Sequence, residues 1–230
     1  MQVSKISDSR VASRVFRTLR RVALGLALPL LAAACEPYSE INTKFWDSLD
    51  RAPFIQLPLS DAWISHPEVS LVLERHHGSV TEQRLLLPNR TSIRGDNFML
   101  MVAREGPLSR IGRFRPAGMV ERNAGPPEPF LDFDGQPMTS LKDDFGWLHW
   151  SQWTNGTDLT CVLAFRRLDA NDRIMPFKTS SIDMMLRNCM RGTAEEALAP
   201  ISDLYTGYAA IADTPSGHQR MLSPLAGPLP

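Results

Sequence analysis

The sequence lacks any apolar stretch long enough to cross a bilayer as a helix. A spanning helix needs about 20 apolar residues, and the apolar run at residues 22–34 has thirteen. The chain also lacks the glycine-rich loops of nucleotide-binding proteins, the H-E-x-x-H and C-x-x-C patterns, and the G-x-S-x-G turn of hydrolases. We therefore predict no cofactor, no nucleotide, no metal site and no catalytic residue, so that the protein is not an enzyme.

The first 34 residues combine a basic region with the short apolar run. Residues 1–21 carry six basic residues against one acidic residue, and the run 22–34 follows. This order is typical of a secretory signal, because the positive region stays in the cytoplasm while the apolar run enters the export channel. The run ends in Leu31-Ala-Ala-Ala-Cys35, which resembles a bacterial lipobox with its Leu one place earlier than usual.

This junction predicts that residues 1–34 are a lipoprotein signal peptide and that Cys35 carries a lipid anchor. The alternative is an ordinary signal cleaved after Ala34, which leaves an unmodified cysteine. Glu36 rather than Asp follows Cys35, and by analogy with enterobacterial sorting this favours the outer membrane, facing the periplasm. The membrane is then a partner of the protein through the anchor.

Excess basic charge is absent once the signal is set aside. The whole chain has 25 basic and 25 acidic residues, of which residues 1–34 contain six and one, so the remainder has 19 and 24 and a net charge of −5. A mildly acidic chain has no electrostatic footprint for nucleic acid. The remaining length suits one domain.

Cysteine is scarce, with three residues in the chain. If Cys35 carries lipid, Cys161 and Cys189 remain as a pair in an oxidising compartment, where disulfides persist. We predict that these two residues form a disulfide, and the alternative is two buried free thiols.

The apolar pattern predicts several strands. Residues 69–74 alternate apolar and polar residues, which is typical of a half-buried strand. Residues 80–87 can be the return strand after a turn expected at His76-His77-Gly78-Ser79. Residues 97–103 are a continuous apolar run, which is typical of a central strand covered on both faces. The expected strands are residues 69–74, 80–87, 97–103, 159–168 and 181–189.

Proline and glycine divide the rest of the chain. Residues 116–137 hold five Pro and three Gly, which we interpret as a long loop because proline is poorly tolerated inside helices and central strands. Thr193-Ala-Glu-Glu196 is a capping box that predicts a helix, limited or kinked by Pro200. Residues 214–230 are rich in Pro, Gly and Ser and are expected to be a disordered tail.

Together these signals predict an α+β fold. We expect a single strand-rich, mainly antiparallel domain with a few helices at residues 67–213, after the signal and a tether at residues 35–66.

A cluster of tryptophans stands out in the middle of the chain, at Trp147-Leu-His-Trp150-Ser-Gln-Trp153. On a strand Trp147, His149 and Trp153 share one face and Trp150 takes the other. The indoles could form a platform on which sugar rings stack, with His149 among the hydrogen-bonding groups. Core packing is the interpretation that we favour, since aromatic residues are mostly packing residues.

Two regions of the chain resemble a known family. The stretch Glu82-Gln-Arg-Leu-Leu-Leu-Pro-Asn89 through Gly95-Asp-Asn-Phe98 is similar to the early strands of BcsN-type cellulose-biosynthesis proteins of alphaproteobacteria. Cys161-Val-Leu-Ala-Phe165, followed by Met185-Leu-Arg-Asn-Cys189 and a short helix, is similar as well. The resemblance implies an accessory envelope protein of exopolysaccharide production, and it transfers no catalytic residue.

Two classes of function follow from these observations. The first is a non-enzymatic envelope lipoprotein that assists the biosynthesis or export of an exopolysaccharide, cellulose, with the synthesis or export machinery as its partner. The second is a periplasmic module that binds or hydrolyses glycans through the Trp147–Trp153 cluster.

Replacement of Cys35 tests the anchor. Cys35→Ser removes the thiol that accepts the lipid, so labelled fatty acid should no longer be incorporated and the protein should move from the membrane to the soluble periplasmic fraction. A variant that keeps its lipid label would contradict the predicted anchor.

Overall fold

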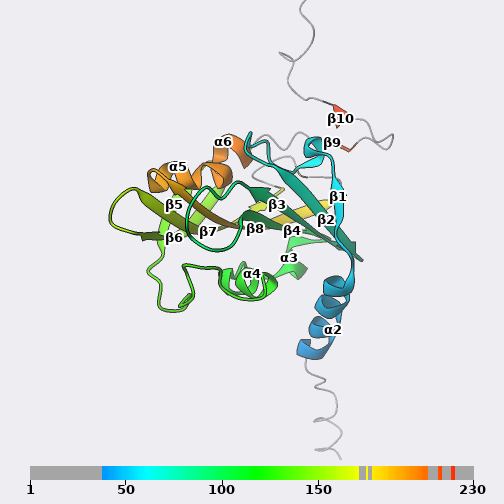
Figure 1. The fold of residues 1–230 in the computed structure, drawn as a ribbon. Helices are drawn as coiled ribbons and strands as arrows, with labels where there is room; N and C mark the ends of the chain where they lie inside the picture. Colours follow the sequence, from blue (N-terminus) through cyan, green and yellow to red (C-terminus); the bar gives the residue numbers. More distant parts are fainter. Residues whose placement is uncertain (1–37, 171–174, 176–177, 207–211, 214–218, 221–230) are drawn as a thin grey trace, which may run out of the picture. The chain divides into compact units, whose positions relative to one another are not determined.

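The computed structural model of the chain describes residues 38–170, 175, 178–206, 212–213 and 219–220 (Figure 1). The predicted signal, Cys35 and most of the predicted tail lie outside these residues. The chain divides into two compact units at Asp50 and Arg51. The described part of the first unit is most of helix α2 (Tyr38–Arg51). No helix among the described residues is long and apolar enough to cross a membrane.

An eight-stranded sheet forms the second unit, in the order β1-β2-β3-β4-β8-β7-β6-β5. Every neighbouring pair is antiparallel, which confirms the strand-rich, antiparallel fold. The strands are β1 (Ile55–Leu57), β2 (Leu71–His77), β3 (Val80–Leu87), β4 (Asn97–Glu105), β5 (Thr139–Asp143), β6 (Gly146–Thr154), β7 (Leu159–Asp169) and β8 (Thr179–Arg191). Two further short strands, β9 (Ala212–Asp213) and β10 (Gln219–Arg220), pair with each other.

Short helices lie on both sides of the sheet (Figure 1). Helices α5 and α6 lie on one side of it, and α3 and α4 lie on the other. The bounds are η1 (Leu59–Asp61), α3 (Leu108–Ile111), α4 (Pro116–Arg122), α5 (Ala194–Leu198), η2 (Ala199–Ile201) and α6 (Asp203–Thr206).

One face of the sheet carries the main hydrophobic core. Successive residues of a strand point to opposite faces, and on β8 Ile182, Met184 and Leu186 point to this face and are fully buried. The buried side chains of Trp63 and Ile64 belong to the same cluster, together with apolar residues of α5 and η2. This face is closed by apolar packing, the dominant favourable term in folding.

The opposite face of the sheet is rich in buried charge, and we call it the charged face. Its strands contribute arginines and acids between buried apolar residues such as Leu163 and Phe165, and α4 and the loops after α3 and α4 reach these charged groups with an arginine or with carbonyls. Glu82 of β3 accepts hydrogen bonds from arginines of β2 and α4, and Arg167 of β7 donates to the Gly112 carbonyl after α3. Two clusters result, Arg75–Glu82–Arg122 and Arg104–Asp183–Arg167.

The strands expected from the sequence are present in the structure. Residues 97–103 are buried along their whole length in β4, as the continuous apolar run indicated. Strands β1 and β5 were not anticipated, and β6 was considered only as one possible conformation of the tryptophan cluster. β1 has three residues and β5 is largely exposed, so neither carries a burial pattern that periodicity can detect.

Three expectations need correction. The segment 116–137 is not a loop throughout, because α4 begins at Pro116, where the missing N–H of proline is not needed. The two histidines of the expected turn extend β2, and only Gly78 and Ser79 turn. The sheet-containing unit begins at Arg51 rather than at residue 67, since β1 pairs with β2 and Trp63 enters the core.

The capping box at the last helices is formed as its sequence indicated. The Thr193 side chain accepts from the Glu196 amide, and the Glu196 carboxylate accepts from the Thr193 amide. Helix α5 then ends at Leu198, and the chain continues as the 3₁₀ turn η2, which contains Pro200. Proline therefore limits the helix.

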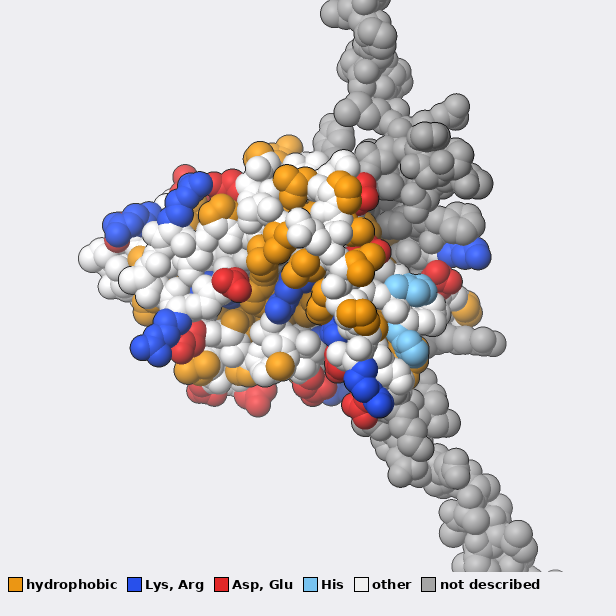
Figure 2. Space-filling view, turned by 45° about the vertical axis from the view of Figure 1, so that its right-hand side comes forward, with side chains coloured by type: hydrophobic (Ala, Val, Ile, Leu, Met, Phe, Trp, Pro, Cys, Tyr) orange, Lys and Arg blue, Asp and Glu red, His pale blue; other side chains and the backbone are white. Residues whose placement is uncertain are grey.

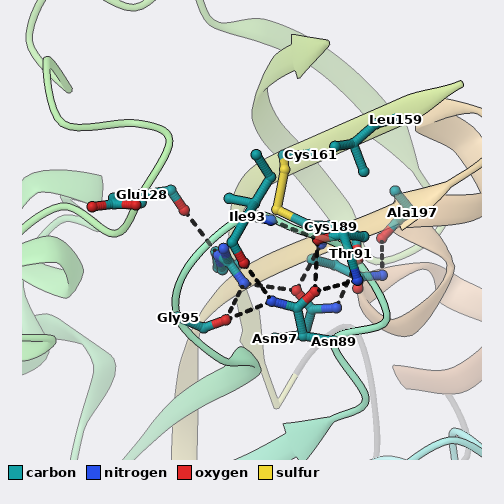
Figure 3. The surroundings of a disulfide bond; sticks show 12 residues. Asn89, Thr91, Ile93, Gly95, Asn97, Glu128, Leu159, Cys161, Cys189 and Ala197 are labelled. Atoms are coloured by element: carbon teal, nitrogen blue, oxygen red, sulfur yellow. Dashed lines mark hydrogen bonds between the residues drawn. A yellow bond between two sulfur atoms is a disulfide. The ribbon is translucent and has the colours of Figure 1, made fainter. Parts of the chain in front are cut away.

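The predicted pair of cysteines forms a disulfide (Figure 3). Cys161 of β7 lies directly opposite Cys189 of β8 in the antiparallel register, with the two Cα atoms 4.0 Å apart. Both cysteines are buried, and the two strands are the fifth and sixth of the sheet order. The bond therefore joins strands in the interior of the sheet rather than at its edge.

Reduction of this disulfide should destabilise the protein. For a loop of 28 residues, the chain-entropy model gives about 3–4 kcal/mol of stabilisation. Urea unfolding with and without a reductant measures this difference in the free energy of unfolding.

The double variant Cys161→Ala/Cys189→Ala is the matched control, because its unfolding should not respond to the reductant. Two alkylatable thiols in the denatured, unreduced wild-type protein would contradict the disulfide.

Candidate functional site

A pocket with a volume of about 330 Å³ opens on the charged face. Its lining comes from the middle strands β3, β4 and β8 and from two loops, residues 94–96 and 123–128. Strands hold their side chains more rigidly than loops do, so the groups on β3 and β8 have well-defined positions. The charged and aromatic residues of the lining are Arg84, Arg94, Asp96, Phe98, Glu128 and Arg187.

Arg187 lies at the inner wall of this pocket and is fully buried. Its guanidinium donates to the carbonyls of Arg94 (2.7 Å), Gly95 (3.1 Å) and Glu128 (3.0 Å). A fourth bond goes to Asn97 Oδ1 at 2.8 Å. All four acceptors are neutral oxygens, so the charge of Arg187 is solvated by dipoles and lacks an ion pair with any carboxylate of the described residues.

Arg84 contributes a second guanidinium to the pocket. It stacks on the ring of Phe98, with Cζ 4.4 Å from the ring centroid, and it donates to Asn123 Oδ1. A cation over an aromatic face is attracted by the quadrupole of the ring. Like Arg187, Arg84 forms no ion pair with a described carboxylate, whereas the other arginines on this face, such as Arg75 and Arg122, do.

The pKa shifts of the two arginines reflect this environment. Burial lowers the pKa of the Arg187 guanidinium, and the negative charges of Asp96 and Glu128 oppose the shift. Burial also lowers the pKa of Arg84, with Glu82 and Asp96 opposing it. Desolvation disfavours the charged form of a group, so both cations lie where a further negative charge would be favourable.

Three other charged residues of the lining, Arg94, Asp96 and Glu128, are exposed. Glu128 contacts Arg187 through its backbone carbonyl and not through its carboxylate (Figure 3). Exposed charges are screened by water and salt much more than buried ones. The two partly or fully buried guanidiniums are therefore the least screened charges of the pocket, and the exposed acids Asp96 and Glu128 still act on them. On the face in Figure 2, by contrast, acidic and basic side chains are interspersed.

The structure separates the tryptophan cluster along β6. Trp150 packs against the hydrophobic core, as the packing interpretation requires. Trp147 exposes 55 % of its surface, which that interpretation does not explain. Its ring is stacked with that of His149, 6.3 Å between centroids and 13° between planes, and His149 Nδ1 lies 2.8 Å from Ser140 Oγ. Trp153 is half-buried beside the disulfide, as the β6–β7 partner of Cys161.

The other site residues predicted from the sequence are the three cysteines, of which Cys161 and Cys189 do not line this pocket. Cys35 lies outside the described residues, and Cys161 and Cys189 hold two strands together. Within the described ranges, no group of three or more His, Cys, Asp or Glu side chains could hold a metal ion.

Sequence reasoning missed the two buried or partly buried arginines of the pocket, Arg187 and Arg84. Arg187 follows Met184, Met185 and Leu186 in a run that forms a buried strand. A cation inside such an apolar run is the one signal that could have found it, since Arg is almost never fully buried without a partner. Arg84 follows Glu82 and Gln83 in β3, where its position in the sequence resembles that of an ordinary solvated residue.

The arrangement offers two desolvated guanidiniums on rigid strands, an aromatic ring and carbonyl and carboxylate oxygens. These groups can bind an anion, and neither arginine is a proton donor or acceptor at neutral pH. Comparison of the chain with protein-family models, with curated proteins and with solved structures finds no match.

Proposed function

We propose that the protein is a non-enzymatic envelope lipoprotein that assists the biosynthesis or export of an exopolysaccharide, namely cellulose. The observation that carries the proposal is the disulfide between Cys161 and Cys189 inside the sheet. Disulfides persist in oxidising compartments and are rare in the cytosol. The bond therefore supports export, which the signal-like start and the Leu31–Cys35 junction also favour.

The pairing of buried and partly buried acids with arginines supports a scaffolding role. Glu82, Asp143 and Asp183 each pair with one or two arginines that come from other elements. Asp143 receives both terminal nitrogens of the fully buried Arg166, at 2.6 and 2.9 Å. Such pairs fix the positions of strands and helices relative to one another, and a protein that presents a rigid surface to a machinery needs this.

Deletion of the gene tests the proposal. We expect less extracellular polymer with an unchanged cytoplasmic pool of sugar nucleotide, because the protein would act after precursor supply. Quantification of secreted cellulose and of the nucleotide sugar in the same cells measures both. Undiminished polymer in the deletion strain would refute the assignment.

Two complementation strains sharpen this experiment. Wild-type protein should restore the polymer, whereas the unanchored variant Cys35→Ser should restore it poorly if the protein acts at the membrane.

Glycan binding at Trp147 is a second candidate function, and one observation favours it. An indole exposed to 55 % beside a stacked imidazole offers an apolar face and nearby polar groups. Aromatic side chains of this kind are common at binding surfaces. The site would consist of Trp147 and His149 on β6, with Ser140 of β5 orienting the imidazole.

Trp147→Ala should weaken binding to soluble glucan fragments while changing the free energy of unfolding by less than about 1 kcal/mol, as is usual for exposed positions. Trp150→Ala is the matched control, because Trp150 packs on the core and large-to-small changes at packed positions commonly cost about 2–5 kcal/mol. Affinity electrophoresis and urea unfolding measure the two effects. Unaltered glucan binding by Trp147→Ala would exclude this site.

A further inference from the structure

We propose that the pocket on the charged face binds a small hydroxylated carboxylic acid, the class that includes the sugar acids, with Arg84 and Arg187 holding its carboxylate. This inference goes beyond the role in polysaccharide production and does not depend on it. The proposal rests on the pocket and on the two guanidiniums in its lining. Both guanidiniums are held in place by their neighbours, and neither forms an ion pair with a carboxylate of the described residues.

The charge balance of the lining favours a single negative charge. Three arginines and two acids line the pocket, which leaves a formal excess of one positive charge. A carboxylate neutralises this excess. A phosphate monoester carries about −1.5 to −2 at neutral pH and would leave the pocket negative, next to Asp96 and Glu128.

The hydrogen-bonding capacity of the arginines matches a carboxylate. A guanidinium has five N–H donors, and Arg187 uses four of them on the carbonyls of the two loops and on Asn97. Arg84 has one hydrogen bond to a described residue, with Asn123. Arg84 thus retains several donors in a fork geometry that suits the two oxygens of a carboxylate.

The fixed positions of the arginines increase their value for binding. The ring of Phe98 holds the Arg84 guanidinium in place, and four oxygens hold that of Arg187. Binding therefore requires little ordering of these side chains, and preorganisation lowers the cost of binding. The positive charges of Arg84 and Arg187 lie in partly desolvated surroundings, where the attraction of an anion is stronger than in water.

The rest of the lining suits hydroxyl groups. The carboxylates of Asp96 and Glu128 accept hydrogen bonds and donate none when ionised. An unsubstituted anion would only be repelled by these two acids, whereas hydroxyls on the same molecule would satisfy them. The volume of about 330 Å³ falls at the small end of ligand pockets, which span about 300–1,000 Å³. A single sugar-sized acid fits this range.

Titration calorimetry with glucuronate tests the proposal on the purified full-length protein. Glucuronate should bind and glucose should not, because glucose lacks the carboxylate. The variant Arg84→Gln should weaken glucuronate binding by at least about tenfold, the usual order for loss of a charge-assisted hydrogen bond. Arg90→Gln is the matched control. It removes the same charge from an exposed surface ion pair with Glu68 and should leave the affinity unchanged.

Inorganic phosphate and Arg187→Lys complete the experiment. Phosphate should compete poorly, and competition equal to that of glucuronate would overturn the choice of a hydroxylated carboxylate. Arg187→Lys keeps the charge but cannot reproduce the four hydrogen bonds to the two loops and Asn97, so it should lose both affinity and stability. Arg84 takes no part in the hydrogen bonds of Arg187, so the variant Arg84→Gln should remain folded. Absence of glucuronate binding to the wild-type protein, or equal binding by Arg84→Gln, would refute the proposal.

Discussion

A buried cation in the middle of the sheet organises the charged face. Arg187 of β8 donates to Asn97 at the start of β4, to the loop that precedes β4 and to the loop that follows α4. Burial of an uncompensated charge is expensive, and it is tolerated only where hydrogen bonds replace hydration. The two loops therefore have to meet at this guanidinium. Their positions define the pocket.

The same site is connected to the disulfide through one amide side chain. Asn97 Oδ1 accepts from Arg187 and from the Cys189 amide, and its Nδ2 donates to the Cys189 carbonyl (Figure 3). Nδ2 also donates to the carbonyl of Pro88. Every polar atom of this buried side chain is thus occupied. A covalent bond between β7 and β8 and a polar network between β8 and β4 lie side by side, so the central strands are held together by more than their ladder hydrogen bonds.

The two faces of the sheet are closed by different forces, and this difference places the candidate site. Apolar packing is non-directional and leaves few voids, and on the core face it brings together Trp63, Met184 and Leu186. On the charged face, α3, α4 and the loop after α4 are held largely by ion pairs and carbonyl contacts at separate points, although buried apolar residues such as Phe130 also contribute. Because these contacts are separate from one another, space remains between the sheet and the covering segments. A polar pocket forms there.

The sequence by itself determined the strands and much of their burial. Alternation at residues 69–74, the apolar run at 97–103, the capping box at Thr193 and the pairing of Cys161 with Cys189 are local or compositional signals, and the structure contains each of them. Tertiary structure decided which polar residues are buried. Period-two alternation indicates that a strand has a polar face, but it does not indicate whether that face meets water or another layer. Arg187 is buried because a layer remote in sequence covers its strand, and only the folded chain brings Glu128 and Arg84 to the same pocket.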